Sequence, residues 1–179
     1  MKTGFFILSL MAIIFGGLRF GTKATGSNPR PEGAAVSYEF SYSNTMRYPN
    51  LWYEVTRGDD GTVRIAWSQH NEPDITIIRG PEDLFERVDA IVAEFRLYRL
   101  KNSYYPRMQV LDGIMWHAYI RFEKNSISSG GSNAWPPEKL RAGIDAINNY
   151  IQSLIDVSTE ADIIGHDDHD SLYSRKYLR

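Results

Sequence analysis

The chain has 179 residues, of which 42% are hydrophobic and 23% charged, with a formal net charge of −2. These proportions are typical of one globular domain and exclude a wholly disordered or fibrous chain. The lack of cysteine excludes disulfides, thiolate metal centres and a cysteine nucleophile. Because the chain has no overall basic charge, nucleic acid is not an expected partner.

The N-terminus has the pattern of an export signal. An apolar stretch over residues 4–18 ends at Arg19, and it is shorter than the ~20 apolar residues that span a bilayer. Residues 1–24 are therefore predicted to be a secretory signal peptide, with Thr22 and Ala24 as the small residues before the cleavage site. An uncleaved membrane anchor formed by residues 4–18 is the alternative. The expected location is periplasmic or secreted, or membrane-anchored in that alternative.

Residues 25–34 are rich in glycine, proline and polar side chains, which is typical of a linker. Apolar and polar residues then alternate over 36–43, as in a strand with one buried face. Two further alternating runs, 51–56 and 63–67, flank a turn rich in glycine and aspartate and predict a β-hairpin. A shorter strand is predicted at 75–78.

The hydrophobic period then changes to that of a helix. Pro81 is suited to the first turn of a helix whose apolar residues, up to Phe95, form a single stripe. A second helix with a similar stripe is predicted after Pro136 and Pro137, extending to Leu154. The chain is therefore expected to contain two amphipathic helices, each needing a partner for its apolar side.

Between the two helices, strands are predicted at 108–111 and 115–122, joined by a turn at Asp112 and Gly113. Ile127 is assigned to a short strand, and residues 128–133 to a small-residue loop. This order of elements predicts an α+β fold: an antiparallel sheet with two amphipathic helices packed on one face.

The predicted domain organisation has three parts after the signal or anchor at 1–24. Residues 25–34 form the linker, residues 35–157 the single α+β domain, and residues 158–179 a polar C-terminal tail that frays. At this size the core needs no disulfides for stability.

Catalytic and metal-binding residue types are present, but without the spacing that their chemistry needs. His166 and His169 are weak candidates for a metal site, and a solvated acidic tail is the favoured interpretation. His117 lies on a strand face and His70 in a loop, and either would need an acidic partner to act as a general base. No cofactor is expected.

Aromatic residues make up 13% of the chain. Trp67 and Trp116 share strand faces with apolar residues and are expected in the core. Trp52 points away from its apolar neighbours, and several tyrosines lie near loops. Such aromatic residues can form a platform for sugar rings or for a protein partner. The candidate binding residues are Trp52, Tyr48, Tyr104 and Tyr105.

A short pattern stands out around the second half of the chain. It consists of Asp112, Gly113, Trp116, Gly131, Asn133, Trp135 and Pro136. With this pattern the chain resembles a loosely defined group of uncharacterised, often exported bacterial proteins, sharply over 104–137 and more weakly over 36–155. The resemblance implies a structural unit, with Trp116 in the core and Asn133 and Trp135 holding a loop on the sheet. This chain departs from the group in having residues 123–125 as its next turn, without Asp-Gly.

The sequence thus favours an exported, non-enzymatic binding or interaction domain of the bacterial cell envelope. The expected partner is an envelope protein or a carbohydrate, with membrane contact only through the N-terminal segment if that is uncleaved. One alternative is a small envelope hydrolase using His117 or His70 with an acidic partner. Another is a passive structural component that assembles through its N-terminal segment.

Overall fold

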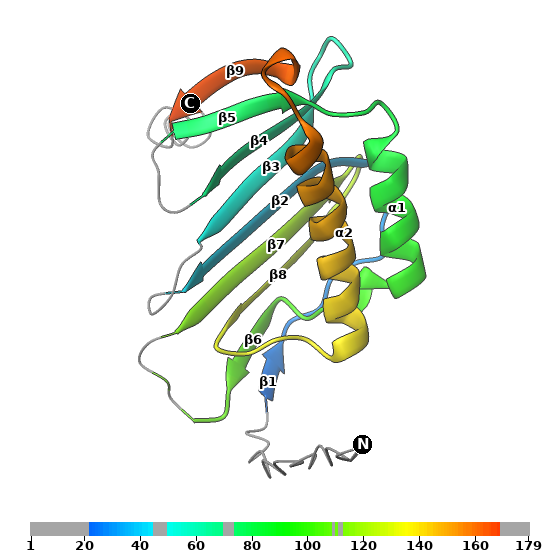
Figure 1. Cartoon of the computed structure of the whole chain (residues 1–179). Helices are drawn as coiled ribbons and strands as arrows, with labels where there is room; N and C mark the ends of the chain where they lie inside the picture. The colour runs from blue at the N-terminus through cyan, green and yellow to red at the C-terminus, as the bar shows by residue number, and fades with distance from the viewer. Residues whose placement is uncertain (1–21, 45–49, 70–73, 109, 111–112, 169–179) are drawn as a thin grey trace, which may run out of the picture.

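The fold is known from a computed structural model that describes residues 22–44, 50–69, 74–108, 110 and 113–168. Within these residues, nine strands form one sheet in the order β1-β6-β8-β7-β2-β3-β4-β5-β9, and two helices cover one of its faces (Figure 1). All pairings are antiparallel except that of β6 with β8. The predicted α+β fold is confirmed.

The strands alternate between a buried and a more exposed side, as their sequences predict. In β2, for example, Tyr38 and Phe40 are buried against the helices, while Glu39 and Ser41 lie on the opposite face. The strands are β1 (Thr22–Thr25), β2 (Ala35–Asn44), β3 (Leu51–Arg57), β4 (Val63–Gln69), β5 (Asp74–Arg79), β6 (Ser103–Pro106), β7 (Ile114–Phe122), β8 (Ser126–Ser132) and β9 (Ile163–Asp168).

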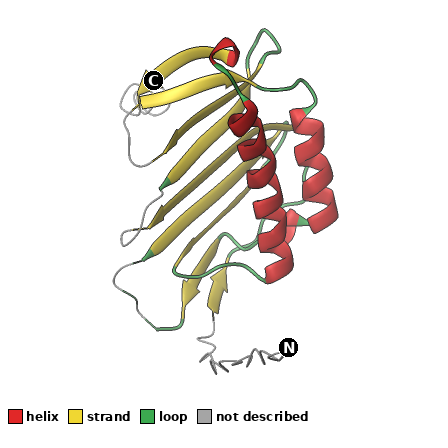
Figure 2. Cartoon of the chain, in the orientation of Figure 1, coloured by secondary structure: helices red, strands yellow, loops and turns green. Residues whose placement is uncertain are grey.

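Helices α1 (Leu84–Phe95) and α2 (Glu138–Val157) lie beside each other on the same face of the sheet (Figure 2). Short 3-10 turns, η1 (Leu97–Arg99) and η2 (Glu160–Asp162), follow them. The connection from β5 to β6 contains α1, and the connection from β8 to β9 contains α2. Each connection passes over most of the strands, because the two strands that it joins lie near opposite edges of the sheet. Both helices therefore lie on one face of the sheet, and the opposite face carries no helix of the described chain.

The core lies between the helices and the sheet. The rings of Tyr38 and Tyr53 are buried there, and the Tyr38 hydroxyl donates a hydrogen bond to Asn148 Oδ1 on α2 at 2.5 Å. Burial raises the pKa of both tyrosines well above the ordinary value. Both rings thus stay neutral, and the Tyr38 bond ties the middle of the sheet to α2.

Two predicted elements between the helices are wrong. The strand expected at 108–111 lies instead at β6, and Met108 and Val110 belong to no strand. The small-residue loop expected at 128–133 is mostly strand β8, which continues to Ser132. The physical reason is packing: a side chain at Gly131 would collide with the Trp116 indole and with the backbone of Ala134. Small residues therefore permit this strand rather than mark its end.

The sheet extends beyond both ends of the domain predicted over 35–157. The tail was expected to fray from residue 158, but β9 pairs with β5 at the edge of the sheet. The expected linker is also attached to the fold, because Asn28 accepts a hydrogen bond from Ser128 N at 2.9 Å and donates one to Leu100 O at 2.9 Å. Residues 1–21 and 169–179 lie outside the described residues.

Candidate functional site

The face of the sheet opposite the helices carries no helix of the described chain, and we call it the uncovered face. One straight row of side chains crosses it from β4 to β8. In register order this row contains Ser68, Trp52, Ser41, His117 and Gly130. Ser41 and Ser68 thus flank the large aromatic ring of Trp52. This mixture of hydroxyl and aromatic groups differs from the apolar face that packs on the helices.

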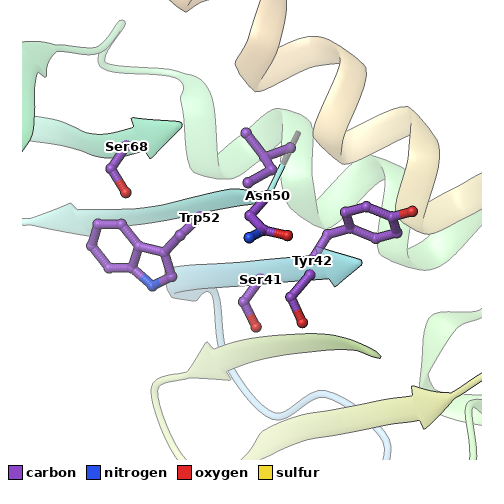
Figure 3. A pocket seen from close by; sticks show the side chains of 7 residues that line it. Ser41, Tyr42, Asn50, Trp52 and Ser68 are labelled. Carbon is purple, nitrogen blue, oxygen red and sulfur yellow. The ribbon is translucent and has the colours of Figure 1, made fainter. Parts of the chain in front are cut away.

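A cavity of about 220 Å³ lies at the Trp52 end of this row (Figure 3). It is formed where β2 ends and β3 begins, with β4 alongside. Trp52 is half-buried, so one part of its ring is held by the sheet while another part remains accessible. The cavity is lined by Ser41, Tyr42, Ser43, Asn50, Leu51, Trp52 and Ser68.

The chemistry of this cavity is neutral. The polar groups of its side chains are hydroxyls, one amide and the Trp52 indole N–H, and its apolar surface comes from Leu51 and the aromatic residues. The Tyr42 ring turns toward the helices, where it stacks on Trp135 with ring centres 6.4 Å apart (Figure 3). The cavity therefore combines an aromatic surface with hydrogen-bonding groups that carry no charge.

Two other hollows differ in having charged walls. One, of about 540 Å³, lies at the turn between β7 and β8 and includes Arg121, Glu123 and Lys124. The other, of about 320 Å³, lies beside the turn between β3 and β4 and includes Arg57 and Asp60 among its charged residues. In both, charges of opposite sign are present together, so neither hollow favours one sign of ligand.

The predicted binding residues do not form one site. Trp52 lies at the cavity, whereas Tyr105 is on β6, four strands away on the same face. Tyr104 is only 3% exposed and stacks on Trp116 with ring centres 6.1 Å apart. Its place in the core corrects the expectation that it contacts a ligand. Tyr48 lies outside the described residues.

The histidines are not gathered into a site either. His117 is exposed on the uncovered face, with its Nε2 3.2 Å from the Ser128 hydroxyl. His166 is exposed on the edge strand β9. Among the described residues, no group of three metal-type ligands could hold an ion. His70 and His169 lie outside the described residues.

The Trp116 region forms a compact structural unit. Trp116 is 4% exposed, its indole nitrogen donates to Ala134 O at 2.8 Å, and its ring stacks on Trp135 with centres 5.1 Å apart. Asn133 Oδ1 accepts a hydrogen bond from Ile114 N at 2.9 Å. Together these contacts hold the connection from β8 to α2 against the start of β7. Pro136 is buried beside them, Gly113 is next to Asn133, and Asp112 lies outside the described residues.

Sequence reasoning missed the residues that surround Trp52. Ser41, Asn50 and Ser68 are ordinary polar residues in the sequence, and only the pairing of β2, β3 and β4 brings them together. The alternating runs did place Trp52 and Ser41 on outward faces. What the runs lacked was the register between strands, which depends on turns and on the buried face.

The described residues contain no helix long and apolar enough to cross a membrane. No family model matches the sequence, and no curated protein matches it. The resemblance noted around residues 104–137 consequently stays a prediction. The uncovered face, with its neutral cavity at Trp52, is the feature from which a function is inferred.

Proposed function

We propose that the protein is an exported, non-enzymatic binding domain of the bacterial cell envelope, and that its ligand is a carbohydrate held at Trp52. The observation that carries this proposal is the half-buried Trp52 ring beside a neutral cavity of about 220 Å³. The apolar stretch and cleavage pattern in residues 1–24 support export.

A sugar ring suits this cavity for two reasons. Its C–H faces pack on an aromatic ring, and its hydroxyls exchange hydrogen bonds with hydroxyl and amide side chains such as Ser41 and Asn50. The volume is below the ~300–1,000 Å³ of pockets that enclose a drug-sized ligand. A single ring of a longer glycan would therefore sit in the cavity, with the rest of the chain lying across the uncovered face.

The alternative of a small hydrolase has less support. A general base acts in a site that holds the substrate beside it. His117 is exposed on a strand and lines none of the three hollows described above. Binding without chemistry therefore accounts better for the arrangement of this face.

The test is binding of the full chain to a glycan array that includes oligosaccharides released from bacterial cell walls, followed by calorimetry on the ligands found. Replacing Trp52→Ala should weaken binding about tenfold, because loss of aromatic stacking and burial costs roughly 1.4 kcal/mol or more. Trp52→Phe keeps a ring and should retain most of the affinity. Val157→Ala is the control, since it removes an apolar side chain that is 74% exposed at the end of α2, away from the uncovered face.

Two outcomes would contradict the proposal. One is the absence of any glycan ligand for the wild-type chain. The other is a Trp52→Ala variant that has a normal circular dichroism spectrum and binds the glycan as tightly as the wild type. Capture of an envelope protein in a Trp52-dependent manner, without glycan binding, would assign the site to a protein partner and overturn the carbohydrate assignment.

A further inference from the structure

The segment from β6 to the start of β7 exposes large apolar side chains at one corner of the sheet. Tyr105 is 48% exposed, Met108 61%, Val110 49% and Met115 60%. These four residues, which we call the apolar corner, come from β6, from the connection after it and from the start of β7. A soluble monomer can carry single apolar residues on its surface, but a group of this kind indicates a contact surface.

The sheet brings the two ends of the corner together. Tyr105 lies next to buried Tyr104 and Met115 next to buried Trp116, so both point to the uncovered face. Between them stands Ser132 of β8, which pairs with Met115. Tyr105 and Met115 are therefore two strand spacings apart, which is roughly 10 Å. The small serine leaves the apolar groups accessible on either side.

The N-terminal segment enters the fold at this same corner. Strand β1 lies beside β6 (Figure 1). In this pairing Thr22 is opposite Pro106 and Lys23 is opposite Tyr105. Only three residues separate the apolar stretch at 4–18 from Thr22. Four residue steps span at most ~14 Å of extended chain. If residues 4–18 are held in a membrane, the apolar corner must therefore lie close to the lipid surface.

The charges at the corner fit the same partner. Lys23 on β1 and Arg107 after β6 are both exposed, and Arg19 lies between the apolar stretch and β1 in the sequence. Basic residues beside apolar ones are attracted to anionic lipid headgroups while the apolar side chains enter the interface. This local pattern contrasts with the net negative charge of the whole chain.

We propose that the apolar corner rests in the surface of the lipid bilayer that holds residues 4–18, so that the domain is oriented by two contacts rather than suspended from one. The inference rests on the anchored form of the exported chain and is independent of carbohydrate binding at Trp52. It places the edge strand β1 and its neighbour β6 at the lipid and directs the opposite edge of the sheet away from it.

The chain has no cysteine, so a single introduced cysteine can be labelled specifically. The full chain is reconstituted into vesicles of phosphatidylcholine with phosphatidylglycerol, with a polarity-sensitive fluorophore at Met108→Cys. Val157→Cys is the matched control, because Val157 is an apolar residue 74% exposed at the end of α2. Ser9→Cys reports whether the N-terminal stretch is in lipid.

The label at position 108 should emit at shorter wavelength and be quenched by nitroxide lipids, whereas the label at 157 should behave as in water. Raising the phosphatidylglycerol content should strengthen the effect at 108. Equal behaviour at 108 and 157, with position 9 in lipid, would overturn the proposal. So would a water-like label at position 9, or cleavage after residue 24 seen by mass spectrometry of the cellular protein.

Protection of position 108 that depends on protein concentration and occurs without vesicles would assign the corner to a second copy of the chain, which also overturns the lipid assignment. Glycan binding is measured on the same labelled samples. Since Trp52 is unchanged in all of them, the failure of either proposal is visible without the other.

Discussion

At the scale of single residues, Asn133 is one of two non-glycine residues, with Arg96, that have a positive φ in the described part of the chain. Its φ of 50° lies in the left-handed region, which costs most L-residues roughly 1–2 kcal/mol but is tolerated by asparagine. Its backbone N–H donates to Ile114 O at 2.8 Å, and its side chain accepts from Ile114 N at 2.9 Å. Asn133 therefore makes two hydrogen bonds to Ile114, one through its backbone and one through its side chain, and these join the end of β8 to the start of β7.

Replacing Asn133→Ala should lower the free energy of unfolding by about 1–3 kcal/mol, since the change removes a hydrogen bond and leaves a less tolerant residue at positive φ. Asn133→Gly also removes the side-chain bond but relieves the backbone, so its loss should be smaller. Urea unfolding of the three proteins measures the order. An alanine variant as stable as the glycine variant would show that the backbone conformation is not under strain.

The residue scale is also where sequence reasoning succeeded unevenly. The alternation around Trp116 is enough to place it in the core, where it is 4% exposed. Tyr104 offers no such pattern, because β6 has only four residues and pairs with β1 and β8 rather than with a hairpin neighbour. A short strand gives too few alternations to decide which side is buried.

At the scale of elements, the contact between α1 and α2 depends on Gly143. A Cβ added at this position would stand 2.6 Å from Phe95 Cβ and 2.7 Å from Leu97 Cδ2. Glycine in a helix interior normally costs ~1 kcal/mol relative to alanine. At this position the close approach of the two helices outweighs that cost, because Phe95 Cβ is attached directly to the backbone and cannot rotate away.

We therefore expect Gly143→Ala to destabilise the protein by about 1–2 kcal/mol, the overpacking cost of ~1–3 kcal/mol exceeding the gain in helix propensity. Asn149→Ala is the control, since Asn149 is exposed on the same helix and should gain a few tenths of a kcal/mol, about the difference in propensity. Thermal unfolding followed by circular dichroism measures both. Stabilisation by Gly143→Ala would mean that the helices have room to separate.

The two helices were predictable because their apolar stripes are long and regular. The strand β8 was not, because its serines and glycines have the composition of a loop. Its identity as a strand depends on pairing with β7 and β6 and on Trp116, whose indole occupies the space where a side chain at Gly131 would lie. This information is tertiary, and no local pattern in residues 126–132 contains it.

At the scale of the whole molecule, the α+β arrangement followed from the order of strands and helices, but the edges of the sheet did not. β1 and β9 have four and six residues, and each pairs with a single strand at an edge of the sheet. Their pairing depends on available backbone groups of β6 and β5 rather than on apolar alternation. The sequence patterns instead assigned residues 22–24 to the export segment, residue 25 to the linker and residues 163–168 to the tail.

These edges should contribute to stability, and a comparison of two fragments tests this. The fragment 35–157 has the bounds expected from the sequence, whereas 22–168 includes both edge strands and the segment with Asn28. We expect 35–157 to unfold at a lower temperature and to aggregate more readily, because it loses Ile163 from the periphery of the core and exposes the backbone edges of β5 and β6. Differential scanning calorimetry with light scattering measures both effects, with the full chain as reference. If 35–157 had the same unfolding temperature and the same tendency to aggregate as 22–168, the edge strands β1 and β9 would contribute nothing to the stability of the sheet.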